Sequence, residues 1–518
     1  MSSGGGGGGS VMGSSGNPAA AGASVGGSVS GGGGGASGSS TGSSGASSTG
    51  GGVTVEPQLI TSGKDDYWKV GALTRGGTSA TVTVKSSSAG RTWDGFGGTF
   101  NEAGWKVLMG LDSAKQTEIM RKLFDVTDGI GFTWGRIPIG PSDYAIERYS
   151  FQESASAPFS IEHDKTTSKA PLMSFIKAAL AVKRDIKFWG SPWTPPPWMK
   201  TGASTAADSM GYDKGSMNKQ FFDQYADYLV NWIKAYEAEG IKIDFIVPQN
   251  EPGWAQAYPS CAWGSYYDGS DHQNGTAYLG DFVTMPLSDK MSKAGLTTDI
   301  WYGTFSNKDT FADYWANLPA DHSKVKGVAL QWATDEDVKK VLDAGFKVMQ
   351  SEHKCGNYPW LTAKAASAAD ATRDNFFAEY APNNHAYGEE SWDLIKSWID
   401  KGVTSYSAWN MVLDKGGWNL DLARPWPQNA LIVVDGGTIK YTAAYYVFRH
   451  VAEYVDPGAT VLTVTDGNAL AFKNPDGAVV TIMYNSANQA STTTLSIDGT
   501  LFQVSIPAHG WATVNYKA

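Results

Sequence analysis

Hydrophobic positions recur at helical and then at strand spacing along most of the chain. Apolar residues over 221–236 follow one helix face and stop at Gly240, and the short apolar run 241–247 follows at once. The same succession of helix, glycine and strand recurs around Gly345 and Gly402. Glycine commonly ends a helix, and strands that are apolar throughout are typical of a parallel sheet covered on both faces. The pattern therefore predicts alternating helices and parallel strands.

Eight apolar runs of this kind fit a single closed sheet. The candidate strands lie near 95–100, 132–139, 186–191, 243–249, 299–304, 326–332, 346–351 and 403–410. Eight parallel strands that alternate with helices are the count of a (β/α)₈ barrel. An open doubly wound sheet is the alternative, but no glycine-rich phosphate loop supports it. The predicted fold class is therefore α/β, a (β/α)₈ TIM barrel.

The pattern changes near Thr460, where short β-branched runs alternate with Asp-Gly turns at 466–467, 476–477 and 498–499. Asp-Gly between apolar runs is a strong hairpin signal. We therefore expect a small β-sandwich beside the barrel, which the strand-like run 81–85 completes. The predicted parts of the chain are a Gly/Ser-rich linker over 1–53, an N-terminal β segment of the sandwich over 54–93, the barrel over 94–427 and the C-terminal β-sandwich over 428–518.

Composition narrows the class of partner. The chain has no charged residue before Glu56 and consists there mostly of Gly, Ser and Ala, which bury too little apolar surface to fold. A net charge of −10 argues against nucleic acid as a partner, and no apolar run is long enough to span a membrane. The 20 Trp and 23 Tyr offer flat apolar faces that suit sugar rings. We expect an extracellular or cell-surface tethered monomer that binds a polysaccharide or oligosaccharide and needs no cofactor or metal, although no signal segment is visible.

Two glutamates close predicted strands four and seven. Glu251 ends the stretch 247–251, and Glu352 ends the stretch 348–352. Because the carboxyl ends of barrel strands share one face, the two side chains can meet across its mouth. Retaining glycoside hydrolysis needs two carboxyl groups about 5–5.5 Å apart, one to protonate the leaving oxygen and one to attack the anomeric carbon. The pair therefore predicts a retaining β-glycosidase.

Neighbouring residues add detail to this prediction. Asn250 is placed to bind the sugar 2-OH, whose hydrogen bond strengthens in the transition state. Arg136 ends another predicted strand and can keep Glu352 ionised. A structural ion pair is the alternative interpretation of Arg136.

Six motifs occur in the order of a known family. They are Asp94-Gly95-Phe96-Gly97-Gly98, Arg136-Ile137-Pro138-Ile139-Gly140, Ser191-Pro192-Trp193-Thr194-Pro195-Pro196-Pro197-Trp198-Met199-Lys200, Gln249-Asn250-Glu251-Pro252, Ser351-Glu352 and Trp409-Asn410. With its flanking β segments, the chain resembles glycoside hydrolase family 30 of clan A, which includes lysosomal glucosylceramidase and microbial β-1,6-glucanases. The resemblance implies that Glu251 is the acid/base and Glu352 the nucleophile. It also implies that Trp193 and Trp409 line the subsite of the cleaved sugar.

Two departures from the family bear on the substrate. The glucosylceramidase branch has Thr-Asp-Ala after its Gly-Gly motif, with the Asp on sugar hydroxyls, where this chain has Asn-Glu-Ala over 101–103. Glu102 is therefore expected to bind the sugar with a longer side chain. The His-Trp-Tyr of that branch is Gln-Trp-Ala over 331–333, where we expect Trp332 to contact substrate. Both changes argue against a ceramide aglycone and favour a microbial polysaccharide.

The preferred interpretation is an endo-β-1,6-glucanase that acts on microbial or fungal polysaccharide. The same mechanism on β-1,6-galactan, xylan or glucosylceramide is an alternative, and a carbohydrate-binding protein without catalysis is an alternative of another class. Trp254, Tyr258 and Trp263 follow the acid/base. They predict sugar platforms on the leaving-group side, unless they serve only to pack the loop.

The two cysteines allow one further prediction. Cys261 lies ten residues after the acid/base and Cys355 three residues after the nucleophile, so both belong to loops over the same barrel face. We predict a Cys261–Cys355 disulfide that ties these loops together, and two buried thiols are the alternative.

Overall fold

The computed structural model describes residues 58–203, 211–267, 272–355, 383–420 and 427–517. All of them belong to one compact unit, Thr54–Ala518. The linker predicted over 1–53 lies outside the described residues. Among the described helices, none combines the length and the apolar character that a membrane span requires.

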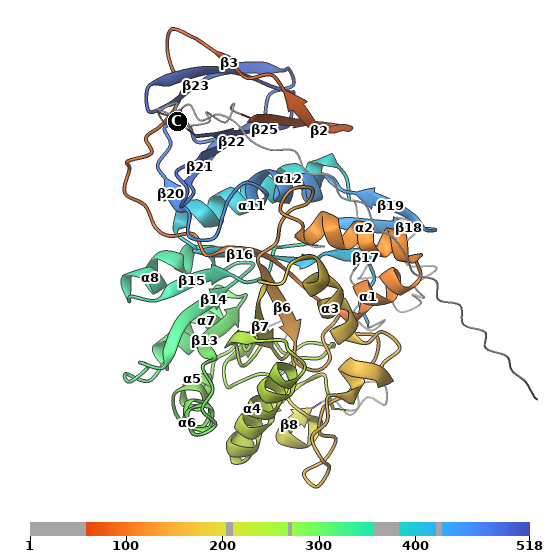
Figure 1. Ribbon diagram of the computed structural model, residues 1–518. Coiled ribbons are helices and arrows are strands. Elements are labelled where there is room, and N and C mark those ends of the chain that lie inside the picture. The colour runs from red at the N-terminus through yellow and green to blue at the C-terminus, as the bar shows by residue number, and fades with distance from the viewer. Residues whose placement is uncertain (1–57, 204–210, 268–271, 356–382, 421–426, 518) are drawn as a thin grey trace, which may run out of the picture. The chain divides into compact units, whose positions relative to one another are not determined.

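Eight parallel strands close into a barrel, which confirms the predicted fold class (Figure 1). They are β5 (Gly95–Thr99), β6 (Trp134–Pro138), β7 (Lys187–Ser191), β10 (Ile243–Ile246), β13 (Asp299–Phe305), β14 (Val325–Leu330), β15 (Lys347–Gln350) and β16 (Ser405–Asn410). Each falls on one of the eight predicted runs. β16 pairs with β5, so the sheet has no free edge.

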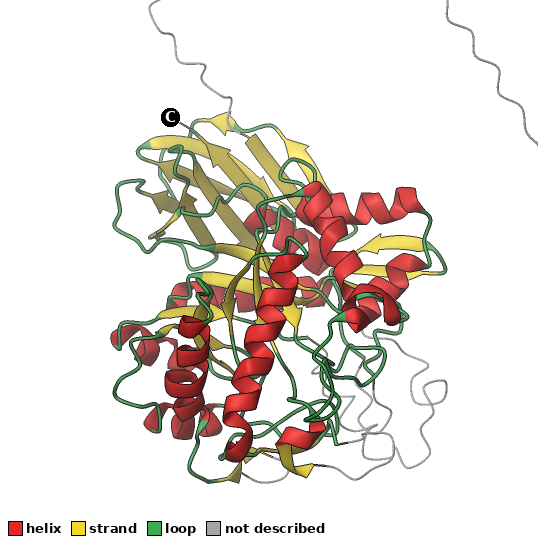
Figure 2. Ribbon diagram, turned by 60° about the horizontal axis from the view of Figure 1, so that its bottom comes forward, coloured by secondary structure: helices red, strands yellow, loops and turns green. Residues whose placement is uncertain are grey.

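Helices surround the barrel strands (Figure 2). They are α1 (Glu102–Met109), α2 (Ser113–Phe124), α3 (Leu172–Val182), α4 (Phe222–Ala238), α5 (Leu279–Phe282), α6 (Ser288–Lys293), α7 (Lys308–Ala316), α8 (Val338–Asp343) and α11 (His385–Lys401), and α12 (Ala443–Ala452) follows β16. The apolar stripe of α4 is buried as its spacing predicts. Gly402 ends α11 with a φ of 120°, a conformation that glycine adopts without strain.

Aromatic side chains from neighbouring strands pack inside the barrel. Trp189 stacks on Phe245 with ring centroids 5.4 Å apart, and Phe245 stacks on Trp301 at 4.8 Å. Met349 belongs to the same buried cluster. This packing fills part of the barrel interior with side chains.

The sandwich consists of two sheets to which both ends of the described chain contribute, as predicted. One sheet has the order β2-β1-β25-β22-β21-β20 and the other β3-β24-β23-β4. The N-terminal strands are β1 (Gln58–Gly63), β2 (Asp66–Gly71), β3 (Thr74–Arg75) and β4 (Val82–Val84). The C-terminal strands are β20 (Thr460–Leu462), β21 (Ala469–Lys473), β22 (Val479–Asn485), β23 (Ser491–Ile497), β24 (Thr500–Ile506) and β25 (Gly510–Tyr516).

Shorter sheets decorate the barrel. β17 (Val412–Asp414) pairs with β18 (Ile432–Asp435), which pairs with β19 (Thr438–Tyr441); β8 (Lys200–Ala203) pairs with β9 (Lys214–Met217), and β11 (Tyr266–Tyr267) with β12 (His272–Gln273). The first part of the range that we assigned to the C-terminal sandwich thus forms β18, β19 and α12, outside both sandwich sheets. α11 and α12 lie between barrel and sandwich (Figure 1).

Candidate active site

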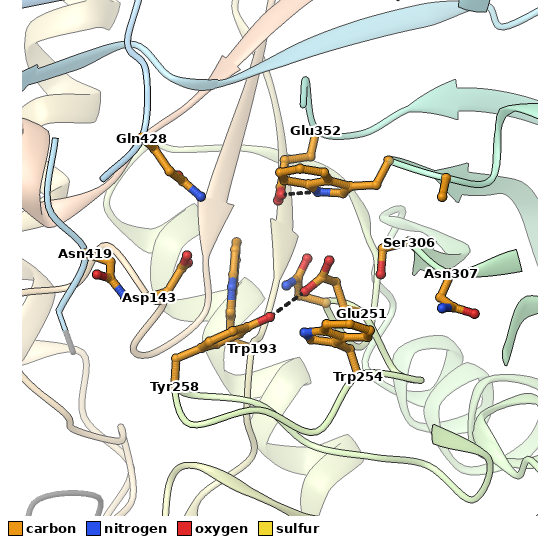
Figure 3. A pocket seen from close by; sticks show the side chains of 13 residues that line it. Asp143, Trp193, Glu251, Trp254, Tyr258, Ser306, Asn307, Glu352, Asn419 and Gln428 are labelled. Atoms are coloured by element: carbon orange, nitrogen blue, oxygen red, sulfur yellow. Dashed lines mark hydrogen bonds between the residues drawn. The ribbon is translucent and has the colours of Figure 1, made fainter. Parts of the chain in front are cut away.

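Glu251 and Glu352 line one cavity at the carboxyl ends of the barrel strands. Glu251 follows β10 and Glu352 follows β15, the fourth and seventh barrel strands. The cavity has a volume of about 400 Å³, and both carboxyl groups point into it (Figure 3). The residues that line it are Asp143, Trp193, Asn250, Glu251, Trp254, Tyr258, Ser306, Asn307, Trp332, Ala333, Glu352, Asn419 and Gln428. The fold therefore brings the predicted pair together.

Both carboxylate oxygens of Glu352 accept a hydrogen bond. Arg136 donates from Nη1 to Oε2 at 2.5 Å, and Trp332 donates from Nε1 to Oε1 at 2.8 Å. Burial raises the pKa of Glu352 above its ordinary value, Arg136 opposes this shift, and the charge of Glu251 adds to it. The two donors fix the direction in which the carboxylate faces the cavity.

Arg136 is fully buried in the middle of β6 and does not line the cavity. Its guanidinium carbon lies 4.4 Å from the ring centroid of Trp193, 4.9 Å from that of Trp189 and 5.5 Å from that of Trp409. These aromatic faces and the ion pair with Glu352 compensate for the loss of water around a buried charge. Arg136 therefore supports the carboxylate and does not line the surface that a substrate would meet.

Asn250 is oriented by two donors. Its Oδ1 accepts from Arg136 Nη2 at 2.6 Å and from Thr304 Oγ1 at 2.9 Å. An amide oxygen has two lone pairs, so both are used and Nδ2 is left to donate into the cavity. This orientation suits the predicted contact with a sugar hydroxyl.

Glu251 lies in a strained backbone conformation that its neighbours hold in place. Its φ is 46°, in the left-handed region that residues other than glycine rarely adopt. Its N–H donates to Thr304 O at 2.9 Å, and its Oε2 accepts from Tyr258 Oη at 2.8 Å. Trp332 has a φ of 55°. Such strain persists only where the surrounding structure enforces it, which is common at functional sites.

A buried lysine anchors the loop that carries Tyr258. Lys200 Nζ donates to Thr194 Oγ1, to Tyr212 O and to Ser260 O at 2.7 to 2.9 Å. All three ammonium hydrogens are thereby used. Burial lowers the pKa of Lys200 to about 8, so the side chain stays protonated at neutral pH. The loop after Glu251 is thus fixed to the segment after β7.

Aromatic rings form one side of the cavity. Trp193 lines it and stacks on Trp409, with ring centroids 5.3 Å apart, so Trp409 lies behind Trp193. Trp254 also lines the cavity and stacks on Tyr267 at 4.9 Å and 10°. Trp254, which is half-buried, therefore presents a surface on which a sugar ring can lie, whereas Trp193 lines the cavity with only 2% of its surface exposed.

The sequence matches two family models over most of its length. The glycosyl hydrolase family 30 TIM-barrel domain matches residues 93–455, and the family 30 beta sandwich domain matches residues 458–514. The chain belongs to glycosyl hydrolase family 30. It is therefore a glycoside hydrolase with a carbohydrate substrate, and the predicted family is confirmed.

Relatives within family 30 carry the names of two kinds of enzyme, endo-1,6-beta-D-glucanase and glucosylceramidase. The endo-1,6-beta-D-glucanase of Neurospora crassa is 27% identical over 469 residues, which cover 83% of this chain and 88% of that protein. The lysosomal acid glucosylceramidase of Mus musculus is 24% identical over 453 residues, 82% of each chain. The solved structure of the endo-beta1,6-glucanase BT3312 has a TM-score of 0.72 at 22% identity and covers 90% of this chain and 100% of that one. The structural likeness shows the shared fold.

Two predicted sugar contacts of this family 30 chain lie away from the cavity. Trp263 is 0% exposed and donates from Nε1 to Gln249 Oε1 at 3.1 Å, within the core. Glu102 is 3% exposed and accepts from Ile146 N at 3.0 Å and from Ser168 Oγ at 2.9 Å. The predictions that Trp263 and Glu102 contact substrate are therefore wrong, because both side chains are already enclosed by protein.

The predicted disulfide is also wrong, since Cys261 and Cys355 are both free and buried. Cys261 Sγ donates to Ala262 O at 3.5 Å, and burial raises the pKa of this thiol to about 12. Cys355 lines a small separate cavity beside His353 and Tyr387. Although both loops leave the same barrel face, each turns its thiol inward into a different part of the core.

Three polar residues at one end of the cavity were not predicted. Asp143 follows β6, and among the described residues its buried Oδ1 has no hydrogen-bond partner. Burial raises the pKa of Asp143 well above its ordinary value, and the charges of Glu352 and Glu251 add to the shift. The rule that polar residues beyond barrel strands form the site would have found Asp143. Asn419 and Gln428 follow β17 rather than a barrel strand, so no such signal marked them.

Proposed function

We propose that this family 30 chain is a retaining β-glycosidase that works by double displacement, with Glu352 as nucleophile and Glu251 as acid/base. The observation that carries the proposal is the pairing of Glu352 with two fixed donors, Arg136 and Trp332, at the cavity that Glu251 also enters. The donors hold the carboxylate in one direction, as a nucleophile requires.

The first step joins the sugar to the enzyme. A carboxylate oxygen of Glu352 bonds to the anomeric carbon while the glycosidic carbon–oxygen bond breaks. Glu251 gives its proton to the leaving oxygen, and Tyr258, which donates to Glu251 Oε2, keeps the acid in place. Glu352 loses its charge as the ester forms, and the nearby Arg136 then stabilises the partial negative charge that remains in the transition state.

The second step releases the sugar. Glu251, now a carboxylate, takes a proton from a water molecule whose oxygen bonds to the anomeric carbon. The ester bond breaks and its electron pair returns to Glu352. Two inversions give net retention of configuration at the anomeric carbon.

The two roles define two ends of the cavity. The acid protonates the leaving group, so Trp254, Ser306 and Asn307, on the side of Glu251 in Figure 3, form a leaving-group wall. Asp143, Asn419 and Gln428 lie at the opposite end and form a glycone wall. We assign the sugar that becomes attached to Glu352 to the glycone wall.

The glycone wall offers directed polar groups. Gln428 Oε1 accepts from Trp409 Nε1 at 2.6 Å and from Asn410 Nδ2 at 2.9 Å, so its amide nitrogen is directed into the cavity (Figure 3). Asp143 adds a carboxyl group to this wall, and Asn250, elsewhere in the cavity lining, adds a second amide donor. Several convergent polar groups beside an aromatic face are typical of a sugar site.

The substrate that fits best is a β-1,6-linked glucan of microbial or fungal origin, attacked within the chain. Support comes from the Neurospora crassa relative and from the Gln-Trp-Ala sequence at 331–333. A second cavity of about 570 Å³, lined in part by Lys106 and Trp418, shares Asn419 with the catalytic cavity. This second cavity gives further sugar residues of the polymer room beyond the glycone wall. An enzyme that hydrolyses such a polymer acts outside the cell.

A substrate panel tests the proposal. The full chain is assayed on pustulan, β-1,6-galactan, glucuronoxylan and glucosylceramide, with Glu352→Gln as the inactive control. Rapid hydrolysis of pustulan with mixed oligosaccharides among the first products is expected. Monosaccharide alone would contradict action within the chain, and inversion of the anomeric centre, read by NMR, would contradict the mechanism.

A further inference from the structure

The first turn of α1 is connected to the glycone wall without reaching the cavity. Asn101 is the N-cap of α1 and Glu102 its first residue, and neither lines the cavity. Both are buried, with exposed fractions of 2% and 3%. Polar side chains so deeply buried need partners, and their partners lead to the glycone wall.

Asn101 leads to Gln428 through one residue. Its Oδ1 caps the helix by accepting from Gly104 N at 2.7 Å, and its Nδ2 donates to Asn410 Oδ1 at 2.9 Å. Asn410 then donates from Nδ2 to Gln428 Oε1 at 2.9 Å. Each amide fixes the orientation of the next, because an amide that accepts at its oxygen must donate at its nitrogen. The chain ends with the Gln428 nitrogen directed into the cavity.

Glu102 leads to Asp143 through the backbone that follows it. Its Oε2 accepts from Ile146 N at 3.0 Å, and the adjacent Ala103 N donates to Tyr144 O at 3.0 Å. On the far side, Leu420 N donates to Asp143 O at 2.7 Å. Glu102 thus holds the segment 144–146 immediately after Asp143, whose own Oδ1 has no partner among the described residues.

A helix cap alone does not account for these contacts. Capping α1 requires only the Oδ1 of Asn101, whereas the Nδ2 of Asn101 and both carboxylate oxygens of Glu102 are used away from the helix. Glu102 Oε1 lies 3.6 Å from His163 Nδ1, and Asp164 Oδ1 lies 3.4 Å from the same nitrogen. The shorter side chain of an aspartate at this position would not reach both of these donors.

We propose that Asn101 and Glu102 are positioning residues that hold Gln428 and Asp143 in register with the bound sugar and do not touch it themselves. The inference rests on the proposed function, because it takes Gln428 and Asp143 as the residues that contact the glycone. It explains why Glu102 is buried at a position where the sequence alone predicted direct contact with the sugar.

Two double-mutant cycles on the full chain test the proposal, with kcat/KM for 4-nitrophenyl β-D-glucoside and for pustulan as the readout. Glu102→Gln is isosteric and removes one acceptor, and we expect roughly a 10-fold loss, with about 100-fold for Asp143→Asn. The double variant should lose no more than Asp143→Asn alone, because the first change acts through the second residue. Asn101→Ser, which keeps a capping oxygen, should likewise add nothing to Gln428→Leu.

Matched controls separate positioning from general stability. Glu147→Gln removes another of the carboxylates that pair with His163, at 3.1 Å, and should leave kcat/KM unchanged. The crossed pair Glu102→Gln with Gln428→Leu should be additive. Additive losses in the cycle of Glu102 with Asp143 would overturn the proposal, as would a loss in Glu147→Gln equal to that in Glu102→Gln.

A measurement without turnover distinguishes failure of this proposal from failure of the proposed function. Amide hydrogen exchange over 143–146 should be at least several-fold faster in Glu102→Ala than in wild type and unchanged in Glu147→Gln. If wild type hydrolyses no glycoside of the panel, the proposed function fails, and exchange still decides the positioning contact. Unchanged exchange in Glu102→Ala would overturn the inference even in an active enzyme.

Discussion

The glycone wall and the leaving-group wall of the cavity differ in how they are held. Asn419 and Gln428 are buried, and Gln428 is fixed by hydrogen bonds that lead back to α1. Ser306 and Asn307 are half-buried and come from the loop after β13. Under the proposed function, we expect the firmly held wall to select one sugar in a fixed orientation and the other wall to accommodate varied leaving groups.

The largest expected effect removes the nucleophile and therefore abolishes the reaction for every leaving group. Glu352→Gln should lower kcat on pustulan and on aryl glucosides by on the order of 10⁵-fold, with an unchanged circular dichroism spectrum. In Glu352→Gly, azide should restore slow turnover and give a glycosyl azide of inverted configuration. Retained activity in Glu352→Gln would show that another group attacks.

Glu251→Gln should separate substrates by their leaving group. Loss of general acid catalysis costs roughly 10²–10⁴-fold where the leaving oxygen needs a proton, as in pustulan. Dinitrophenyl β-glucoside, whose leaving group needs none, should be spared in the glycosylation step, measured as a pre-steady-state burst. Equal damage to both substrates in that step would contradict the role of Glu251 as acid.

Asp143→Asn should damage all substrates alike, because the glycone is common to them. We expect roughly a 100-fold lower kcat/KM, because the amide cannot make the same hydrogen bonds to the sugar hydroxyls as the carboxyl group does. The ratio of activity on pustulan to activity on an aryl glucoside should stay constant. A selective loss on the polymer would place Asp143 outside the glycone wall.

Trp254, which lines the cavity, and Trp263, which lies in the core, provide a further test of the leaving-group wall. Trp254→Ala should lower kcat/KM on pustulan several-fold and hardly affect an aryl glucoside, since a stacked ring contributes about 0.5–1.5 kcal/mol by analogy with aromatic pairs. Trp263→Ala is the matched control within the core. It should reduce the free energy of unfolding by about 3–5 kcal/mol without selecting between substrates, as chemical denaturation would show.

The smallest expected effect concerns pH. Burial raises the pKa of Glu102 to about 7, and burial also raises that of Glu453 to about 7. Both values lie above those of the unfolded chain, so the stability that protonation contributes is fully present below about pH 4.5 and is lost as the pH rises through 7. Between pH 5 and pH 8 the Tm of wild type should decline relative to that of Glu102→Gln, because the variant lacks this titrating carboxyl group. An identical pH dependence of Tm in the two proteins would contradict the assignment.

The sequence by itself determined the barrel, the sandwich and the two central carboxylates. Strand and helix periodicities are local, so each of the eight strands could be placed, and the carboxyl ends of parallel strands must share a face. Glu251 and Glu352 follow from that rule together with the two carboxyl groups that retaining hydrolysis needs. Asp143 obeys the same rule and could have been included.

Only the tertiary structure decided which side chains face the substrate. Trp254 and Trp263 lie on the same loop, yet one lines the cavity and the other is enclosed by core residues. Cys261 and Cys355 belong to loops on the same barrel face, but their thiols point into different parts of the core.

Glu102 occupies a motif position that predicted sugar binding, but its carboxylate oxygens accept hydrogen bonds from Ile146 and Ser168. Side-chain direction in loops depends on contacts with distant segments, such as the pairing of Asn101 with Asn410, and no local pattern records those contacts.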